Sequence, residues 1–198
     1  MTLPRAILIV YAALFFTCLT WKIASTWSMI GYCPITLLKS SKRTARVISL
    51  AMYLGISFYP LAMILSTWLG TIPFFAPVAV FQRKPIHFVG GALLGLATGL
   101  FAMSLRALGA SWRIGIDPES KSPLITHGIY GVVRHPIYVS MVLMMIGGFL
   151  TYASVFSAVA VAMVIPAVHM VAVREERFLH EKLGQLYAEY ASRTLRGV

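Results

Sequence analysis

The sequence predicts an all-α, polytopic membrane protein with five transmembrane helices and a C-terminal amphipathic helix. Apolar residues make up 59% of the 198 residues and charged residues only 12%, whereas about half of the residues of a soluble domain are apolar. The apolar residues gather in runs that approach or exceed the roughly 20 residues needed to cross a hydrocarbon core. Lysines and arginines fall in short clusters between these runs, as is typical of membrane proteins. The net charge of +11 is therefore not taken to indicate a nucleic-acid partner.

The first two crossings are predicted over residues 6–30 and 47–70, joined by a basic loop. Pro60 predicts a kink in the second helix, because it cannot donate a backbone hydrogen bond. Residues 71–81 contain two prolines and predict a re-entrant or interfacial loop.

The third crossing is predicted over residues 86–108. Gly91, Gly95 and Gly99 recur every four residues along one side of this helix. Small residues at this spacing let two helices approach closely in lipid, so we expect a packing seam.

The fourth and fifth crossings are predicted to form a tight hairpin. Residues 137–172 are too many for one crossing and enough for two short ones, with a turn near Tyr152. From residue 173 the composition changes to mixed charge with apolar residues at helical spacing, which predicts an amphipathic helix at the membrane surface. We expect a single domain over residues 1–198, with three helices in residues 1–108 and the cofactor-binding and catalytic region in residues 109–198.

The distribution of charge predicts how the chain sits in the membrane. With five crossings, only Arg5, Arg83 and Lys84 fall on the N-terminal side, and the other clustered cations fall on the opposite side. The positive-inside rule therefore predicts an external N-terminus and a cytoplasmic central stretch and tail.

The central stretch, residues 124–138, is the place where glycines, aromatics, two histidines and an arginine converge between apolar runs. Pro136 suits the first position of a helix. Arg134 and His135 then lie where a membrane helix meets water, beside free backbone N–H groups that attract anions.

A second polar element, the pair Glu175 and Glu176, is predicted to meet the same membrane face. His169 and Glu176 are seven residues apart and share a helix face, while Glu175 points elsewhere. The sequence leaves open which glutamate faces a ligand. Cys18 and Cys33 have no ligand residues nearby, so we expect no metal site.

These motifs resemble the isoprenylcysteine carboxyl methyltransferase family of integral-membrane enzymes. The resemblance rests on residues 128–138, which include Arg-His-Pro, and on Glu175-Glu176 followed by Leu179, Gly184, Tyr187 and Tyr190. It covers about residues 122–193, and the N-terminal half matches only in hydropathy.

The resemblance implies S-adenosylmethionine as methyl donor, bound on the cytoplasmic side without a Rossmann fold. The residues implied or chemically suited to bind this cofactor are Ser122, Pro123, Leu124, Ile125, Tyr130, Arg134, His135, Pro136, Ile137, Tyr138 and Glu175. Candidate substrate residues are Glu176, His169 and Arg174.

Each part of the donor suits particular side chains. The donor's carboxylate suits His135 and the N–H groups ahead of Pro136. Its hydroxyls or amino group suit Glu175. Leu124, Ile125 and Tyr138 could wall the adenine, and Tyr130 or Tyr138 could lie against the sulfonium.

In that family the acceptor is the carboxylate of a C-terminal cysteine that carries a prenyl thioether. A carboxylate is already ionised at neutral pH, so no acid or base residue is assigned. The prenyl chain would enter from the lipid. Eukaryotic members carry an arginine just before the glutamate pair, where this chain has Val171.

Three alternatives remain open from the sequence. An enzyme of the same fold could methylate a phospholipid amine or a small thiol, and an amine would need a base such as Glu176 or His169. A sterol-reductase-like enzyme would use NADPH. A small transporter or scaffold would use no such cofactor.

Overall fold

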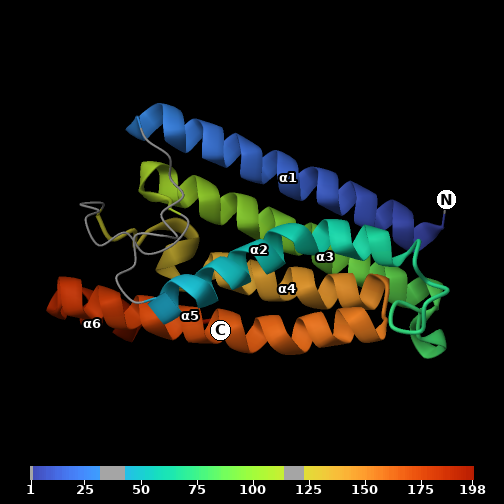
Figure 1. Cartoon of the computed structure of the whole chain (residues 1–198). Coiled ribbons are helices and arrows are strands. Elements are labelled where there is room, and N and C mark those ends of the chain that lie inside the picture. The colour runs from blue at the N-terminus through green and yellow to red at the C-terminus, as the bar shows by residue number, and fades with distance from the viewer. Residues whose placement is uncertain (1, 32–42, 114–122) are drawn as a thin grey trace.

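The computed structural model describes residues 2–31, 43–113 and 123–198. Five long helices lie side by side in these ranges, and a short sixth helix follows them (Figure 1). They are α1 (Leu3–Ile30), α2 (Arg43–Ser66), α3 (Lys84–Leu108), α4 (Pro136–Thr151), α5 (Val155–Leu183) and α6 (Gln185–Arg193). The 3-10 turns are η1 (Ala79–Phe81), η2 (Gly109–Ser111) and η3 (Gly128–Gly131).

Three helices of the described ranges are long and apolar enough to cross a membrane, namely Leu3–Ile30, Lys84–Ser111 and Val155–Leu183. Tyr53–Ser66 and Pro136–Thr151 are shorter apolar helices. Apolar side chains point outward on these helices: Leu96 on α3 is 62% exposed and Met163 on α5 is 70% exposed. Such an apolar exterior suits contact with lipid. The expected all-helical membrane architecture is therefore found.

The core is built from aromatic and sulfur-containing side chains of four helices. Phe15 of α1 stacks on Phe101 of α3, with ring centroids 5.5 Å apart. Tyr59 of α2 is buried against them and donates a hydrogen bond to the Met145 carbonyl of α4 at 3.1 Å. Since a buried hydroxyl needs a partner, this bond ties α2 to α4.

The end of the bundle away from α6 is closed by the loop after α2 and the α4–α5 turn. The backbone N–H of Val78 donates to Ala153, and that of Phe156 donates to Phe74. The Tyr152 hydroxyl donates to the Phe75 carbonyl at 3.2 Å. The predicted irregular loop and the predicted hairpin turn are thus both found, and they lie against each other. The expected kink residue Pro60 lies inside α2 (Arg43–Ser66), which begins and ends four residues earlier than the predicted range 47–70.

The predicted glycine seam is wrong in register. A Cβ on Gly95 or Gly99 would meet nothing within 4 Å, whereas one on Gly90 would lie 2.8 Å from the Gly147 carbonyl of α4. The reason is that α3 packs mainly on α4, and Gly90 lies on that face. The seam therefore joins Gly90 to Gly147, and only Gly91 of the predicted set meets a neighbour, Ile7 of α1.

The predicted amphipathic helix from residue 173 begins later than expected. Helix α5 continues unbroken to Leu183, because the change to polar residues at 173 brings no glycine or proline that would stop a helix. Gly184, at φ +53°, makes the break, and α6 follows. Glu175 and Glu176 therefore lie on the same continuous helix as the apolar segment of α5.

Candidate active site

The central stretch folds into a tight turn that starts α4. Gly128 opens η3 at φ +61°, a backbone conformation that favours glycine. His135 caps α4, and Pro136 is the first helical residue, as predicted. The ring of His135 then stacks on the ring of Tyr138 one turn later, with centroids 5.4 Å apart and planes 20° apart.

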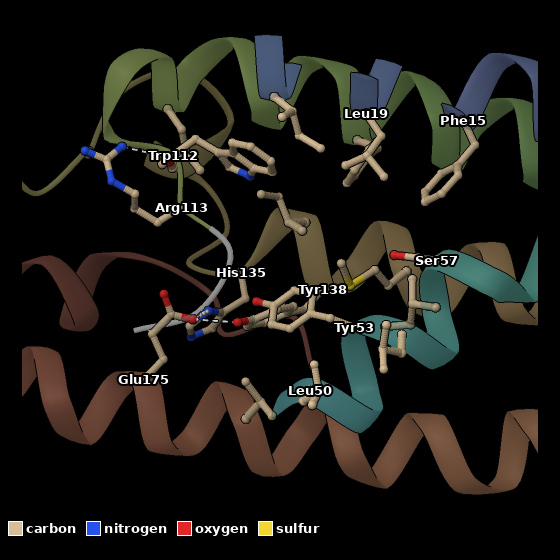
Figure 2. Close-up of a pocket in the computed structure, with 18 of the residues that line it drawn as sticks. Phe15, Leu19, Leu50, Tyr53, Ser57, Trp112, Arg113, His135, Tyr138 and Glu175 are labelled. Carbon is tan, nitrogen blue, oxygen red and sulfur yellow. Dashed lines mark hydrogen bonds and ion pairs between the residues drawn. The ribbon is translucent and has the colours of Figure 1, made fainter. Parts of the chain in front are cut away.

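A larger cavity of about 440 Å³ opens between α1, α2 and this turn (Figure 2). Its walls are mostly aliphatic and aromatic, and charged groups gather at one end, where Arg113, His135 and Glu175 lie. The apolar end is formed by Phe15, Leu19, Ile23, Leu50, Leu54, Ile56, Phe101, Ile137, Met141 and Val171. This cavity suits a ligand with an apolar chain and a polar head.

A smaller cavity of about 200 Å³ lies on the other side of these charged groups. Three cations line it, Arg113, Arg134 and Lys182. Its apolar and aromatic lining is Pro123, Leu124, Ile125, Phe178, Leu179, Leu183, Tyr187 and Tyr190. This cavity suits a ligand with a flat apolar part and an anionic group.

The two cavities meet along one set of residues, which we call the shared wall. It consists of Leu108, Arg113, Tyr130, Arg134, His135 and Glu175. A ligand in one cavity would therefore touch the same side chains as a ligand in the other.

Glu175 presents its carboxylate to both cavities. The Tyr138 hydroxyl donates to Glu175 Oε2 at 2.8 Å, and His135 Nδ1 lies 3.8 Å from the same oxygen. The Glu175 side chain keeps 36% of its surface exposed. It can therefore accept further hydrogen bonds from a ligand.

Glu176 lies behind the shared wall and is nearly buried. Its Oε1 forms an ion pair with Arg134 Nη1 at 3.0 Å and lies 3.2 Å from His135 Nε2. Its Oε2 forms an ion pair with Arg196 Nη2 at 2.7 Å. Glu176 thus holds Arg134 and His135 in place.

Tyr130 is held on the wall by the C-terminal helix. The Tyr190 hydroxyl of α6 donates to the Tyr130 carbonyl at 2.7 Å. Burial, and then the negative charge of Glu175, raises the pKa of Tyr130 well above its usual range. Its ring therefore stays a neutral phenol beside the carboxylate.

The structure brings most of the predicted site residues together. Pro123, Leu124 and Ile125 line the smaller cavity, Ile137 and Tyr138 line the larger one, and Tyr130, Arg134, His135 and Glu175 line both. In the part of the chain that the structure describes, Pro136, His169, Arg174 and Glu176 line neither cavity, and His169 is exposed. Ser122 lies outside the described residues.

Sequence reasoning missed the contribution of the segment after α3. Trp112 is buried against the larger cavity, and Arg113 reaches both cavities. Lys22 of α1, almost fully buried, donates to the Gly109 carbonyl at 2.7 Å and so anchors this segment. A tryptophan and an arginine directly after a predicted membrane helix are the available signal, and the sequence-based prediction uses only the charge of the arginine.

Comparison with known proteins places the chain among membrane methyltransferases. A family model described as phospholipid methyltransferase matches residues 85–186, which include the whole shared wall. Protein-S-isoprenylcysteine O-methyltransferase B of Arabidopsis thaliana is 29% identical over 159 residues, which cover 78% of this chain and 80% of that protein.

Two shorter matches cover less than half of the matched proteins. Protein-S-isoprenylcysteine O-methyltransferase A of Arabidopsis thaliana is 35% identical over 86 residues, 43% of this chain and 44% of that protein. The cobalt-zinc-cadmium resistance protein CzcN of Cupriavidus metallidurans is 36% identical over 104 residues, 50% of this chain and 46% of that protein.

Proposed function

Since the chain belongs to the phospholipid methyltransferase family and is a methyltransferase, we propose that it transfers a methyl group from S-adenosylmethionine to the C-terminal carboxylate of an isoprenylcysteine-type acceptor. The relatives named isoprenylcysteine O-methyltransferases agree with the resemblance drawn from the Arg-His-Pro motif and the glutamate pair. The observation that carries the proposal is the pair of cavities that meet at the shared wall.

The smaller cavity is the proposed donor site. S-adenosylmethionine supplies an activated methyl group on a sulfonium. Arg134 and Lys182 offer positive charge for its carboxylate, and Leu124 and Ile125 offer an apolar wall for its adenine. Glu175 can accept from hydroxyl or amino groups.

His135 serves the donor site differently from the sequence-based expectation. Both of its ring nitrogens lie toward glutamates, at 3.8 Å from Glu175 and 3.2 Å from Glu176. We propose that His135 orients Glu175 and that Arg134 takes the larger share of the donor's carboxylate.

The larger cavity is the proposed acceptor site. Its apolar end fits a prenyl chain, and Arg113 at the shared wall offers positive charge for the carboxylate. Val171 lines this cavity at the position where eukaryotic relatives carry an arginine, so Arg113 would supply that charge from the end of α3. The acceptor carboxylate is ionised at neutral pH and needs no base. Alignment of the reacting atoms and exclusion of water would accelerate the methyl transfer.

We propose one membrane-embedded domain with five crossings, an external N-terminus and a cytoplasmic active site. Arg113 and Arg134 lie at the end of the bundle where α3 ends and α4 begins, and Arg5 and Lys84 lie at the other end (Figure 1). That asymmetry follows the positive-inside rule. A cysteine placed at exposed Arg193 should react with an impermeant thiol reagent from the cytoplasmic side only, and one at Lys84 from the outside only. The opposite labelling would overturn the orientation.

The test of the function starts with donor binding. Calorimetric titration of the detergent-solubilised protein with S-adenosylhomocysteine should show micromolar binding, and NADPH should not bind. Glu175→Gln should weaken this binding about tenfold or more, because a hydrogen bond to a charged group contributes about 1.5–3 kcal/mol. Glu181→Gln is the matched control, since Glu181 is exposed on the same helix. Equal affinities for the two variants would remove Glu175 from the site.

The second step identifies the acceptor. N-acetyl-S-farnesylcysteine should become a methyl ester, from which mild base releases methanol, and its carboxamide analogue should not react. A phosphatidylethanolamine vesicle tests the alternative of amine methylation. Glu176 and His169, the bases considered from the sequence, line neither cavity, so Glu175 would take the proton. Base-stable methylation of that lipid, with none of the farnesylcysteine, would replace the carboxylate acceptor by an amine. NADPH binding alone would move the protein to the reductases.

A further inference from the structure

The last residues of the chain form a strap across the back of the shared wall. We call residues 194–198 the C-terminal strap. The backbone N–H of Arg134 donates to the Leu195 carbonyl at 2.8 Å, and the N–H of Leu195 donates to Val132 at 2.9 Å. Val133 and Leu195 make a parallel β-bridge, so the strap pairs with the segment just before His135.

The strap fits closely on the start of α4. Gly197 is at φ +89°, and a Cβ there would lie 2.7 Å from Val133 Cγ1 and 2.7 Å from Val139 Cγ2. Val198 packs against a second group of buried apolar side chains, which includes Tyr138, Met141 and Val168. Only glycine at position 197 allows this approach.

Arg196 carries the strap's positive charge to Glu176. Its Nη2 lies 2.7 Å from Glu176 Oε2 and its Nε donates to Oε1 at 3.1 Å, so the guanidinium grips both carboxylate oxygens. Glu176 is 10% exposed and Arg196 is 42% exposed. A nearly buried carboxylate needs such charged partners to remain ionised at this position.

We infer that Arg196 is a positioning residue for methyl-donor binding. The strap brings Arg196 to Glu176, and Glu176 in turn holds Arg134 and His135 on the shared wall. Without Arg196, the full charge of Glu176 falls on Arg134 and His135 and draws them away from the smaller cavity. This inference rests on the proposed function, because the affinity to be measured is that for the proposed methyl donor.

The test compares Arg196→Gln with Arg193→Gln in the full chain. Arg193 is exposed on α6 and serves as the matched control. Arg196→Gln should raise the dissociation constant for S-adenosylhomocysteine about tenfold, by analogy with the roughly 10–100-fold loss of affinity when a residue that orients a metal ligand is removed. Arg196→Lys should restore part of the affinity, and Arg193→Gln should stay within twofold of the unmodified protein. An equal affinity for Arg196→Gln and Arg193→Gln would overturn the inference.

A double-mutant comparison asks whether Arg196 acts through Glu176. In the background of Glu176→Gln, adding Arg196→Gln should change the affinity by less than twofold, because the link is already lost. A further tenfold loss would mean that Arg196 acts independently of Glu176.

Hydrogen exchange separates a failure of this inference from a failure of the proposed function. Arg196→Gln should speed amide exchange in residues 132–135, where the strap is paired, relative to Arg193→Gln. Failure of the unmodified protein to bind S-adenosylhomocysteine would reject the proposed donor. The exchange result would then still show whether Arg196 holds the strap against residues 132–135. Unchanged exchange in residues 132–135 would reject the strap's role.

Discussion

Replacing Gly90 by alanine tests the contact that sets the distance between α3 and α4. A Cβ at Gly90 would lie 2.5 Å from Thr151 Oγ1, 2.7 Å from Thr151 N and 2.8 Å from the Gly147 carbonyl. Ordinary contact begins at 3.4 Å, and two of these atoms are backbone, so they cannot rotate away. The helices would have to separate by roughly 0.7 Å at this point.

The expected cost follows from this overpacking. Extra methyl groups in a tight core cost about 1–3 kcal/mol. For a chain of this size each kcal/mol lowers the melting temperature by roughly 2–4 °C, so the fall should be about 2–12 °C. Gly95→Ala on the same helix is the control, since its Cβ would meet nothing within 4 Å. It should leave the melting temperature unchanged or raise it slightly, because alanine favours a helix over glycine.

The assay is thermal unfolding in detergent, followed by tryptophan fluorescence, with S-adenosylhomocysteine affinity measured at low temperature. Gly90 is 18 residues from Leu108 at the site end of α3, or about 27 Å along the helix. Donor affinity should therefore stay unchanged while stability falls. A melting temperature for Gly90→Ala equal to that of Gly95→Ala would refute the packing argument.

Three further predictions concern single polar groups. Tyr59→Phe removes the bond to the Met145 carbonyl and should cost about 1 kcal/mol, seen as a lower melting temperature; an unchanged value would show that this bond contributes nothing. Lys22→Met removes the bond to the Gly109 carbonyl and should raise the KM for a farnesylcysteine acceptor several-fold, while the donor's dissociation constant stays within twofold; an unchanged KM would show that this anchor does not support the acceptor site. Burial, and then a nearby carboxylate, raises the pKa of Tyr187 to about 12. The stability from its neutral phenol is complete below the unfolded pKa of about 10 and is lost as pH rises toward 12, so Tyr187→Phe should lessen the alkaline fall in melting temperature.

The fold was predictable wherever one short pattern decided it. Pro136 marked the start of α4, and the polar interruption near Tyr152 marked the hairpin turn. The end of α5 was harder, because a helix does not stop where its composition becomes polar. The helix is broken at Gly184. Gly184 enters the sequence-based prediction only as part of the family motif, with no conformation assigned to it.

The site was predictable only where its residues lie close in sequence. The stretch before α4 and the glutamate pair could be found from their motif. Arg113 and Arg196 could not. Arg113 reaches the shared wall and Arg196 reaches Glu176 behind it, each from a distant segment whose path depends on tertiary packing. The same limit applies to Gly90 and Gly91, one residue apart, of which tertiary packing selected Gly90 for the α3–α4 contact.

Because α5 is unbroken, the number of residues in it sets how far Glu175 lies from the start of the helix. Glu175 stands 20 residues after Val155, so the helical rise puts it about 30 Å from the start of α5, which is the thickness of a hydrocarbon core. In the proposed orientation, the number of residues between Val155 and Glu175 would hold the Glu175 carboxylate at the water–lipid boundary. The proposed water-soluble donor and lipid-soluble acceptor could then meet there while each stays in its own phase.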